Sequence, residues 1–328
     1  MEVFLHITPK FGYSEEERGI FMIGWIGFLL FVVVSFLMGA IRSIEYVEMM
    51  LVIAYGVFVP MGLRLFAPDA DRWVAWLWRL HPIAFVATLV SFLLDRGLWS
   101  TVFSLPWFFW TALLSLYGLW TLWKRQAWRT LPELLLHVGP VYIVVGGMWL
   151  VLHRTGLDIM GFPDIIVLLT SIHFHYAAFV VPIVFGLALR AAGARLGKVA
   201  SFLGSLVLVG PIFVALGITF GESLPWFEFF AVVELVVPIA LLSFLFLWKW
   251  VPTLEDTRAK GLLIIGFGSL FVSMSFAFLY GYGHVHDGEE LMFLSIPLMV
   301  FVHGMVNVFG FSLFTLLGMR RLRELGKV

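Results

Sequence analysis

The sequence predicts an all-α fold, a polytopic bundle of helices embedded in a membrane. Hydrophobic residues make up 61% of the 328 residues and charged residues only 13%, and the mean hydropathy is +1.00. Soluble domains carry roughly 45 to 50% apolar and about 25% charged residues. The apolar residues also occur in long runs, as expected when lipid is the solvent. This composition excludes a soluble cytosolic enzyme, a nucleic-acid-binding module and a disordered regulator.

A membrane-spanning helix needs about 20 mostly apolar residues, and ten segments meet this requirement. In chain order they are 19–41, 47–67, 73–94, 98–123, 131–152, 164–189, 199–221, 226–250, 261–282 and 291–319. The first follows charged residues and lacks a small-residue cleavage pattern, so we interpret it as a retained span rather than a signal peptide. The third is the weakest, because Arg79, His81 and Pro82 interrupt it. The others are nearly continuous apolar runs.

The basic residues predict the orientation, because short cytoplasmic loops accumulate Lys and Arg. With the N-terminus in the cytoplasm, all but three of the 21 Lys and Arg residues fall on the cytoplasmic side. The exceptions are Arg42, Arg96 and Arg154. One missed span would invert every later loop, so this asymmetry favours ten spans with both termini inside. We expect a short cytoplasmic segment at 1–18, a transmembrane domain at 19–319 and a basic cytoplasmic tail at 320–328.

Charge and cysteine content exclude several kinds of site. The 21 basic residues balance 21 acidic ones, so net charge gives no reason to expect a polyanionic partner such as nucleic acid. The chain has no cysteine, which excludes disulfides, thiolate metal sites and iron–sulfur clusters.

Ionisable residues within the predicted spans are costly in lipid and usually face a partner, a cavity or a substrate. At 1.5 Å per residue, His173 and His175 lie roughly 14 to 17 Å deep in the sixth span. Counted from residue 222, Glu234 lies roughly 18 Å deep in the eighth span. Counted from residue 290, His303, which Asn307 follows by one turn, lies roughly 20 Å deep in the tenth. All fall between the outer third and the middle of the bilayer, and they can meet if these spans are neighbours. Otherwise each makes an interhelical hydrogen bond, worth about 0.6 to 2 kcal/mol.

Helix geometry separates the two neighbouring histidines. Residues two apart point about 200° apart around a regular helix, so a straight helix cannot aim both at one ion. Either one faces the site and the other bonds a neighbouring helix, or Pro182 marks an irregular segment there. We favour His173 as the site residue, because Thr170 and Ala177 leave room on its face.

Two stripes, each a row of residues along one face of a predicted helix, suggest close helix packing. In the tenth span, His303, Asn307 and Gly310 follow at helical spacing, and Gly310 would let a neighbour approach closely. The ninth span carries small and hydroxyl residues along one face, a pattern that membrane helices use for packing: Gly266, Ser269, Ser273, Ala277 and Tyr280.

The loop between the last two spans is rich in histidine and acidic residues. His284, His286 and Asp287 carry the imidazole and carboxylate groups expected to bind zinc or copper. The alternative is a polar turn exposed to water.

Two motifs resemble the YndJ-like family of bacterial integral membrane proteins. They are His173-Phe174-His175-Tyr176-Ala177-Ala178-Phe179 and His303-Gly304-x-x-Asn307-x-x-Gly310-Phe311. The resemblance is clearest from about residue 160 onward, and the earlier spans match only in being hydrophobic. It implies a multi-pass protein of the bacterial cell (inner) membrane and marks the two motifs as functional stretches, without implying a chemistry.

These observations favour a membrane-embedded enzyme with a lipophilic, lipid or isoprenoid-like, substrate. Glu234 would be a general acid or base, His173 and His303 would relay protons, and Asn307 would hold a polar group of the substrate. Its partners would be the bilayer and this small molecule; the sequence does not define an oligomeric state.

Three other functions stay open. In a redox or metal protein, His173 or His175 together with His303 would ligate haem or a divalent metal. In a proton-coupled transporter, the Glu and His residues would form a relay. The fourth alternative is a non-catalytic scaffold.

Overall fold

The computed structural model describes residues 15–37, 43–67, 71–221, 223–286, 291–293 and 296–328. Nearly all of these residues are helical, which confirms the predicted all-α class. The first half contains α2 (Glu15–Leu37), α3 (Ser43–Ile53), η1 (Ala54–Phe58), α4 (Val59–Phe66), α5 (Arg72–Leu93), α6 (Leu98–Lys124), η2 (Ala127–Arg129) and α7 (Leu131–Thr155).

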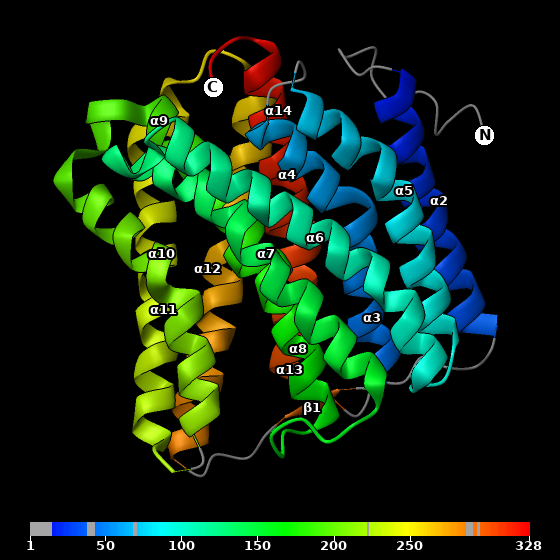
Figure 1. The fold of residues 1–328 in the computed structure, drawn as a ribbon. Helices are drawn as coiled ribbons and strands as arrows, with labels where there is room; N and C mark the ends of the chain where they lie inside the picture. Colours follow the sequence, from blue (N-terminus) through cyan, green and yellow to red (C-terminus); the bar gives the residue numbers. More distant parts are fainter. Residues whose placement is uncertain (1–14, 38–42, 68–70, 222, 287–290, 294–295) are drawn as a thin grey trace.

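The second half continues the bundle. It contains α8 (Asp164–His175), η3 (Tyr176–Val180), α9 (Val181–Ala192), η4 (Gly193–Leu196), α10 (Gly197–Phe220), α11 (Pro225–Leu245), η5 (Phe246–Trp250), η6 (Val251–Thr253), α12 (Thr257–Val285), β1 (Met292–Phe293), β2 (Ile296–Pro297), α13 (Leu298–Met305), η7 (Val306–Ser312) and α14 (Leu313–Glu324). At one edge of the bundle α10, α11 and α12 pack side by side, and at the opposite edge α2 packs on α5 (Figure 1).

Eight helical stretches of the described chain are long and apolar enough to cross a membrane, and Arg18–Val34 is a shorter apolar helix. One of the eight, Asp164–Phe220, includes both the α8–α9 pass and α10, which meet at the turn η4. α2 begins and α14 ends at the same end of the bundle (Figure 1). This agrees with an even number of passes; the count of ten and the cytoplasmic location of the termini stay predictions.

Four segments of the described chain are π-helical: η1, η3, η5 and η7. Proline lies in the first turn after η1, at Pro60, and after η3, at Pro182. Proline lacks an N–H and clashes with the carbonyl four residues earlier, which favours such wide turns. An irregular segment thus lies beside Pro182, but it begins only after His175, so His173 and His175 both lie on regular helix.

The tenth predicted span begins later than expected. Residues Met292–Phe293 and Ile296–Pro297 pair as two antiparallel strands, and the helix starts only at Leu298. Pro297 explains the boundary, since it has an extended backbone and disfavours helix in the residue before it. The depth counted for His303 from residue 290 is therefore wrong: His303 lies roughly 8 Å from the start of its own helix.

The stripe on α12 packs as predicted. A Cβ on Gly266 would lie 3.0 Å from the backbone nitrogen of Thr315, and one on Gly310 would lie 2.8 Å from the hydroxyl of Ser269. The small residues thus let α12 contact η7 and α14 closely. This contact fixes the segment that carries His303 and Asn307.

Candidate functional site

His175 has a structural role, because both of its ring nitrogens are hydrogen-bonded within the protein. Its side chain is fully buried, its Nδ1–H donates to the carbonyl of Ser171 at 2.8 Å, and its Nε2 accepts from the indole N–H of Trp107 at 3.0 Å. The ring of Tyr55 lies against it, with ring centres 4.7 Å apart. Both nitrogens are satisfied, so neither is left to bind a metal or a substrate.

His173, two residues earlier, has a different environment. Its Nδ1–H donates to the carbonyl of Leu169 at 2.7 Å, and its Nε2 has no hydrogen-bond partner among the described residues. The side chain is only partly buried. The 200° separation expected from helix geometry thus places one histidine in a closed contact and leaves the other with an open nitrogen.

His303 on α13 is held by α12. Its Nδ1 lies 3.0 Å from both the hydroxyl and the carbonyl oxygen of Ser273, and because the carbonyl can only accept a hydrogen bond, Nδ1 must carry the hydrogen. This fixes the tautomer with hydrogen on Nδ1 and a lone pair on Nε2. Within the part of the chain that the structure describes, this Nε2 too has no hydrogen-bond partner.

The structure brings His173 and His303 together. They lie close enough to interact electrostatically, and the π-helical segments η3 and η7 that follow them are in contact. Both side chains have many protein atoms around them yet keep some accessible surface, and none of the eight residues of α13 is fully buried. The pair therefore offers two basic Nε2 atoms that no described residue binds.

Asn307 lies four residues after His303, at the second position of η7, and is half-buried. The spacing is one turn of a regular helix, but the π-helical turn is wider and displaces Asn307 around the axis. Its neighbour on the same segment, Gly310, packs on Ser269.

Glu234 has different neighbours from the two histidines. Neither of its buried carboxyl oxygens has a hydrogen-bond partner among the described residues, so it is not hydrogen-bonded to His173, His303 or Asn307. No electrostatic interaction links it to the histidines. Its carboxyl instead lies against Gly210 on α10. The expected cluster of three thus contains two members in the structure.

The outer-loop histidines are separately engaged. The Nε2 of His284 lies 3.7 Å from a carboxyl oxygen of Glu228, and the Nδ1–H of His286 donates to the carbonyl of Tyr282 at 2.9 Å. Among the described residues no three His, Asp or Glu side chains are grouped to hold a metal ion. Asp287 lies outside the described residues, so the metal site at His284, His286 and Asp287 stays a prediction.

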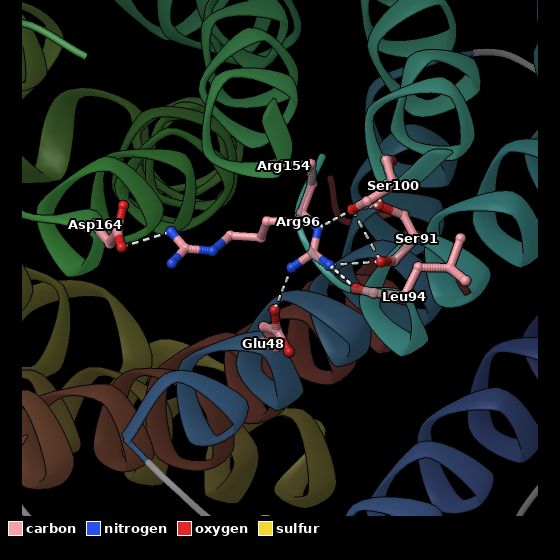
Figure 2. A network of polar contacts seen from close by, with 7 residues as sticks. All are labelled: Glu48, Ser91, Leu94, Arg96, Ser100, Arg154 and Asp164. Carbon is pink, nitrogen blue, oxygen red and sulfur yellow. Dashed lines mark hydrogen bonds and ion pairs between the residues drawn. The ribbon is translucent and has the colours of Figure 1, made fainter. Parts of the chain in front are cut away.

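A buried ion pair escaped the sequence analysis, which placed Arg154 in an outer loop. Arg154 lies in the last turn of α7 and is 3% exposed, as is its partner Glu48 on α3, with 2.8 Å between Nη1 and Oε1. Its Nε donates to the hydroxyl of Ser100 and its Nη2 to the carbonyls of Ser91 and Leu94, each at 2.6 Å (Figure 2).

The neighbourhood of this ion pair is also polar. Arg96 points away from Arg154 and pairs with Asp164 at 2.6 Å (Figure 2). His153 is buried, and neither of its ring nitrogens has a hydrogen-bond partner among the described residues. Only the position of Arg154 directly after an apolar run could have signalled burial.

The His173–His303 pair can do two kinds of chemistry. A neutral imidazole with a free Nε2 can take a proton from a substrate, and its protonated form can give one back. The same nitrogen can ligate a metal, for which a carbonyl-bound Nδ1–H is the usual support. Two imidazoles supply two protein ligands, which suits haem better than a four-coordinate zinc ion.

Comparisons with known proteins agree with the membrane architecture. The family model described as YndJ-like protein matches residues 49–311, a range that contains His173, Glu234, His303 and Asn307. An uncharacterized membrane protein YndJ of Bacillus subtilis (strain 168) is 31% identical over 242 residues. This match covers 73% of the chain but only 41% of the relative, so the chain spans less than half of that protein's length. No solved structure matches the chain.

Proposed function

The chain belongs to the YndJ-like protein family, and we propose that it is a membrane-embedded enzyme that acts on a lipophilic substrate by acid–base chemistry at His173 and His303. One observation carries the proposal. Two imidazoles from distant parts of the chain lie close enough to interact electrostatically, each with Nδ1–H bound to a carbonyl and Nε2 open. The cell membrane of a bacterium, the inner one where there are two, is its proposed location.

The pairing of the two rings gives each a role. Two imidazolium charges in a low-dielectric space repel each other, so the pair is most stable with at most one extra proton. One ring is then a base through its Nε2 lone pair while the other donates as an acid. Asn307 would orient a polar group of the substrate, since its amide can both donate and accept hydrogen bonds.

The local backbone geometry supports a functional role for this region. π-Helical turns occur often at functional sites, and here η3 begins three residues after His173 and η7 three residues after His303. The helices that carry the pair are apolar, which suits a lipid or isoprenoid-like substrate that would enter from the bilayer.

Asparagine substitutions test the proposal. Asparagine places a donor where imidazole has Nδ1–H and removes Nε2, so His173→Asn and His303→Asn keep the carbonyl contacts. Lipid extracts of membranes containing the wild-type chain are compared by mass spectrometry with those of each variant. We expect a lipid species whose conversion falls by roughly 10² to 10⁴-fold in both variants, the usual contribution of a general acid or base.

His286→Asn is the matched control, because His286 also donates its Nδ1–H to a carbonyl but is exposed at the C-terminal end of α12. This variant should convert lipid like the wild type. If both site variants remain folded and convert lipid at the wild-type rate, the proposal is wrong.

A second candidate, a haem or metal protein, is favoured by one specific observation: both Nδ1–H groups are oriented by carbonyls, as in metal-ligating histidines. The absorption spectrum and the elemental content of the purified protein test it. A Soret band or bound metal that is lost in both His173→Asn and His303→Asn would support this function over acid–base catalysis.

A further inference from the structure

Glu234 is a buried acid that the proposed histidine chemistry does not use. It lies on α11, roughly 14 Å from the start of that helix, and both of its carboxyl oxygens are buried with no hydrogen-bond partner in the part of the chain that the structure describes. A carboxylate in such a place costs several kcal/mol unless something neutralises it. The site therefore needs a positively charged occupant.

The backbone of the facing helix comes close to this carboxyl group. Gly210 on α10 has no side chain, and a Cβ there would lie 3.2 Å from Oε2 of Glu234 and 2.5 Å from a methyl carbon of Leu235. A glycine at this position therefore lets the backbone of α10 lie directly beside the carboxyl group.

Two prolines add free oxygen ligands on the same pair of helices. Pro211 lies inside α10 and Pro238 inside α11. Each lacks the N–H that would bond the carbonyl four residues earlier, which releases the carbonyls of Val207 and of Glu234 itself. Val207, one turn before Pro211, is fully buried on the face that includes Gly210. Carboxylate and unpaired carbonyl oxygens are the groups with which membrane proteins coordinate protons and sodium ions.

We propose that Glu234, with the carbonyls released by Pro211 and Pro238, forms a binding site for a monovalent cation, a proton or Na⁺, between α10 and α11. The site is separate from the His173–His303 pair and does not rest on the proposed enzyme function. It assigns the α10–α11 pair a role in ion binding.

A hydrophobic carbodiimide tests the proposal, because it enters lipid and reacts with a protonated buried carboxyl. The purified full-length chain is labelled in detergent and mapped by peptide mass spectrometry. We expect an adduct on Glu234 that is lost in Glu234→Gln and retained in Glu228→Gln. Glu228 is the matched control, since it lies on the same helix but pairs with His284. Mapping the wild type assigns the adduct even if a variant fails to fold.

Two arms distinguish the cations. If Na⁺ is the occupant, NaCl slows the labelling of Glu234 at fixed pH and choline chloride does not, because only the unoccupied site reacts. The labelling rate falls about tenfold when the Na⁺ concentration is ten times its dissociation constant. If only the proton binds, Na⁺ has no effect and labelling falls more steeply with rising pH than labelling of a free carboxylic acid in the same detergent. No adduct on Glu234, or an adduct indifferent to both pH and Na⁺, would overturn the proposal.

Discussion

The Arg154–Glu48 region and the His173–His303 region both bury polar groups in an apolar bundle, but they differ in how those groups are satisfied. Every nitrogen of the Arg154 guanidinium donates a hydrogen bond, and the ion pair is buried where α3 and α7 meet the end of α5 and the start of α6. Each site histidine has one nitrogen bound and one open. Closed polar contacts fix helices in place, whereas open ones are available for chemistry, so substitutions should affect stability in the first region and activity in the second.

The largest stability effect is expected for Arg154→Met. This substitution removes the cation and leaves the Glu48 carboxylate buried without it, which typically costs about 3 to 5 kcal/mol. Unfolding in detergent, followed by circular dichroism, measures the loss. The double variant Glu48→Met/Arg154→Met should recover much of it, because no buried charge remains. A loss below about 1 kcal/mol in the single variant would contradict a closed ion pair.

The same substitution at two neighbouring histidines compares the two regions directly. His175→Asn leaves the indole N–H of Trp107 without its acceptor and should cost about 1 to 3 kcal/mol of unfolding free energy. His173→Asn keeps its carbonyl contact and should cost less than about 1 kcal/mol. Thermal unfolding of both variants under one condition is the measurement. Equal losses would show that His173 is as closed as His175.

Ser273→Ala should have a smaller effect, confined to the open region. It removes the hydroxyl beside His303 but keeps the carbonyl that accepts the Nδ1–H. We expect a loss of about 0.5 to 1.5 kcal/mol or less, the usual net value of one hydrogen bond, with retained lipid conversion. Loss of conversion as complete as in His303→Asn would assign the hydroxyl a direct part in the reaction.

The smallest effect on stability is expected for Asp256→Asn, which removes the ion pair between Arg321 and Asp256, a residue outside the membrane spans. Hydrogen bonds from Arg321 at 2.8 Å and from the backbone of Ala259 lower the pKa of Asp256 below its ordinary value of 3.8. A depressed pKa contributes stability that is present above the unfolded value and lost as pH falls through the folded one. The stability difference between the wild type and Asp256→Asn should therefore shrink below pH 3.8. A difference that stays constant down to the acid limit would exclude this contribution.

The sequence predicts correctly those features that depend on a single helix. The length of each apolar run locates the helices, and the 200° spacing predicts that His173 and His175 have different surroundings. The sequence does not predict features that depend on how two helices pack together. The neighbour of Glu234 depends on how α11 packs on α10, and Arg154 and Glu48 lie 106 residues apart, so no local pattern joins them. The strand pair before α13 was missed because the apolar run continues through it.

The contact of Arg154 with the end of α5 also bears on how the chain is made. Its Nη2 bonds the carbonyls of Ser91 and Leu94, which come 63 and 60 residues earlier. The last carbonyls of a helix have no partners within that helix. The Ser91 carbonyl also accepts from the N–H of Leu94 and from the hydroxyl of Ser100, so it has partners before α7 forms. The Leu94 carbonyl has no donor among the described residues other than Arg154. The end of α5 is therefore fully hydrogen-bonded only after α7 has been inserted.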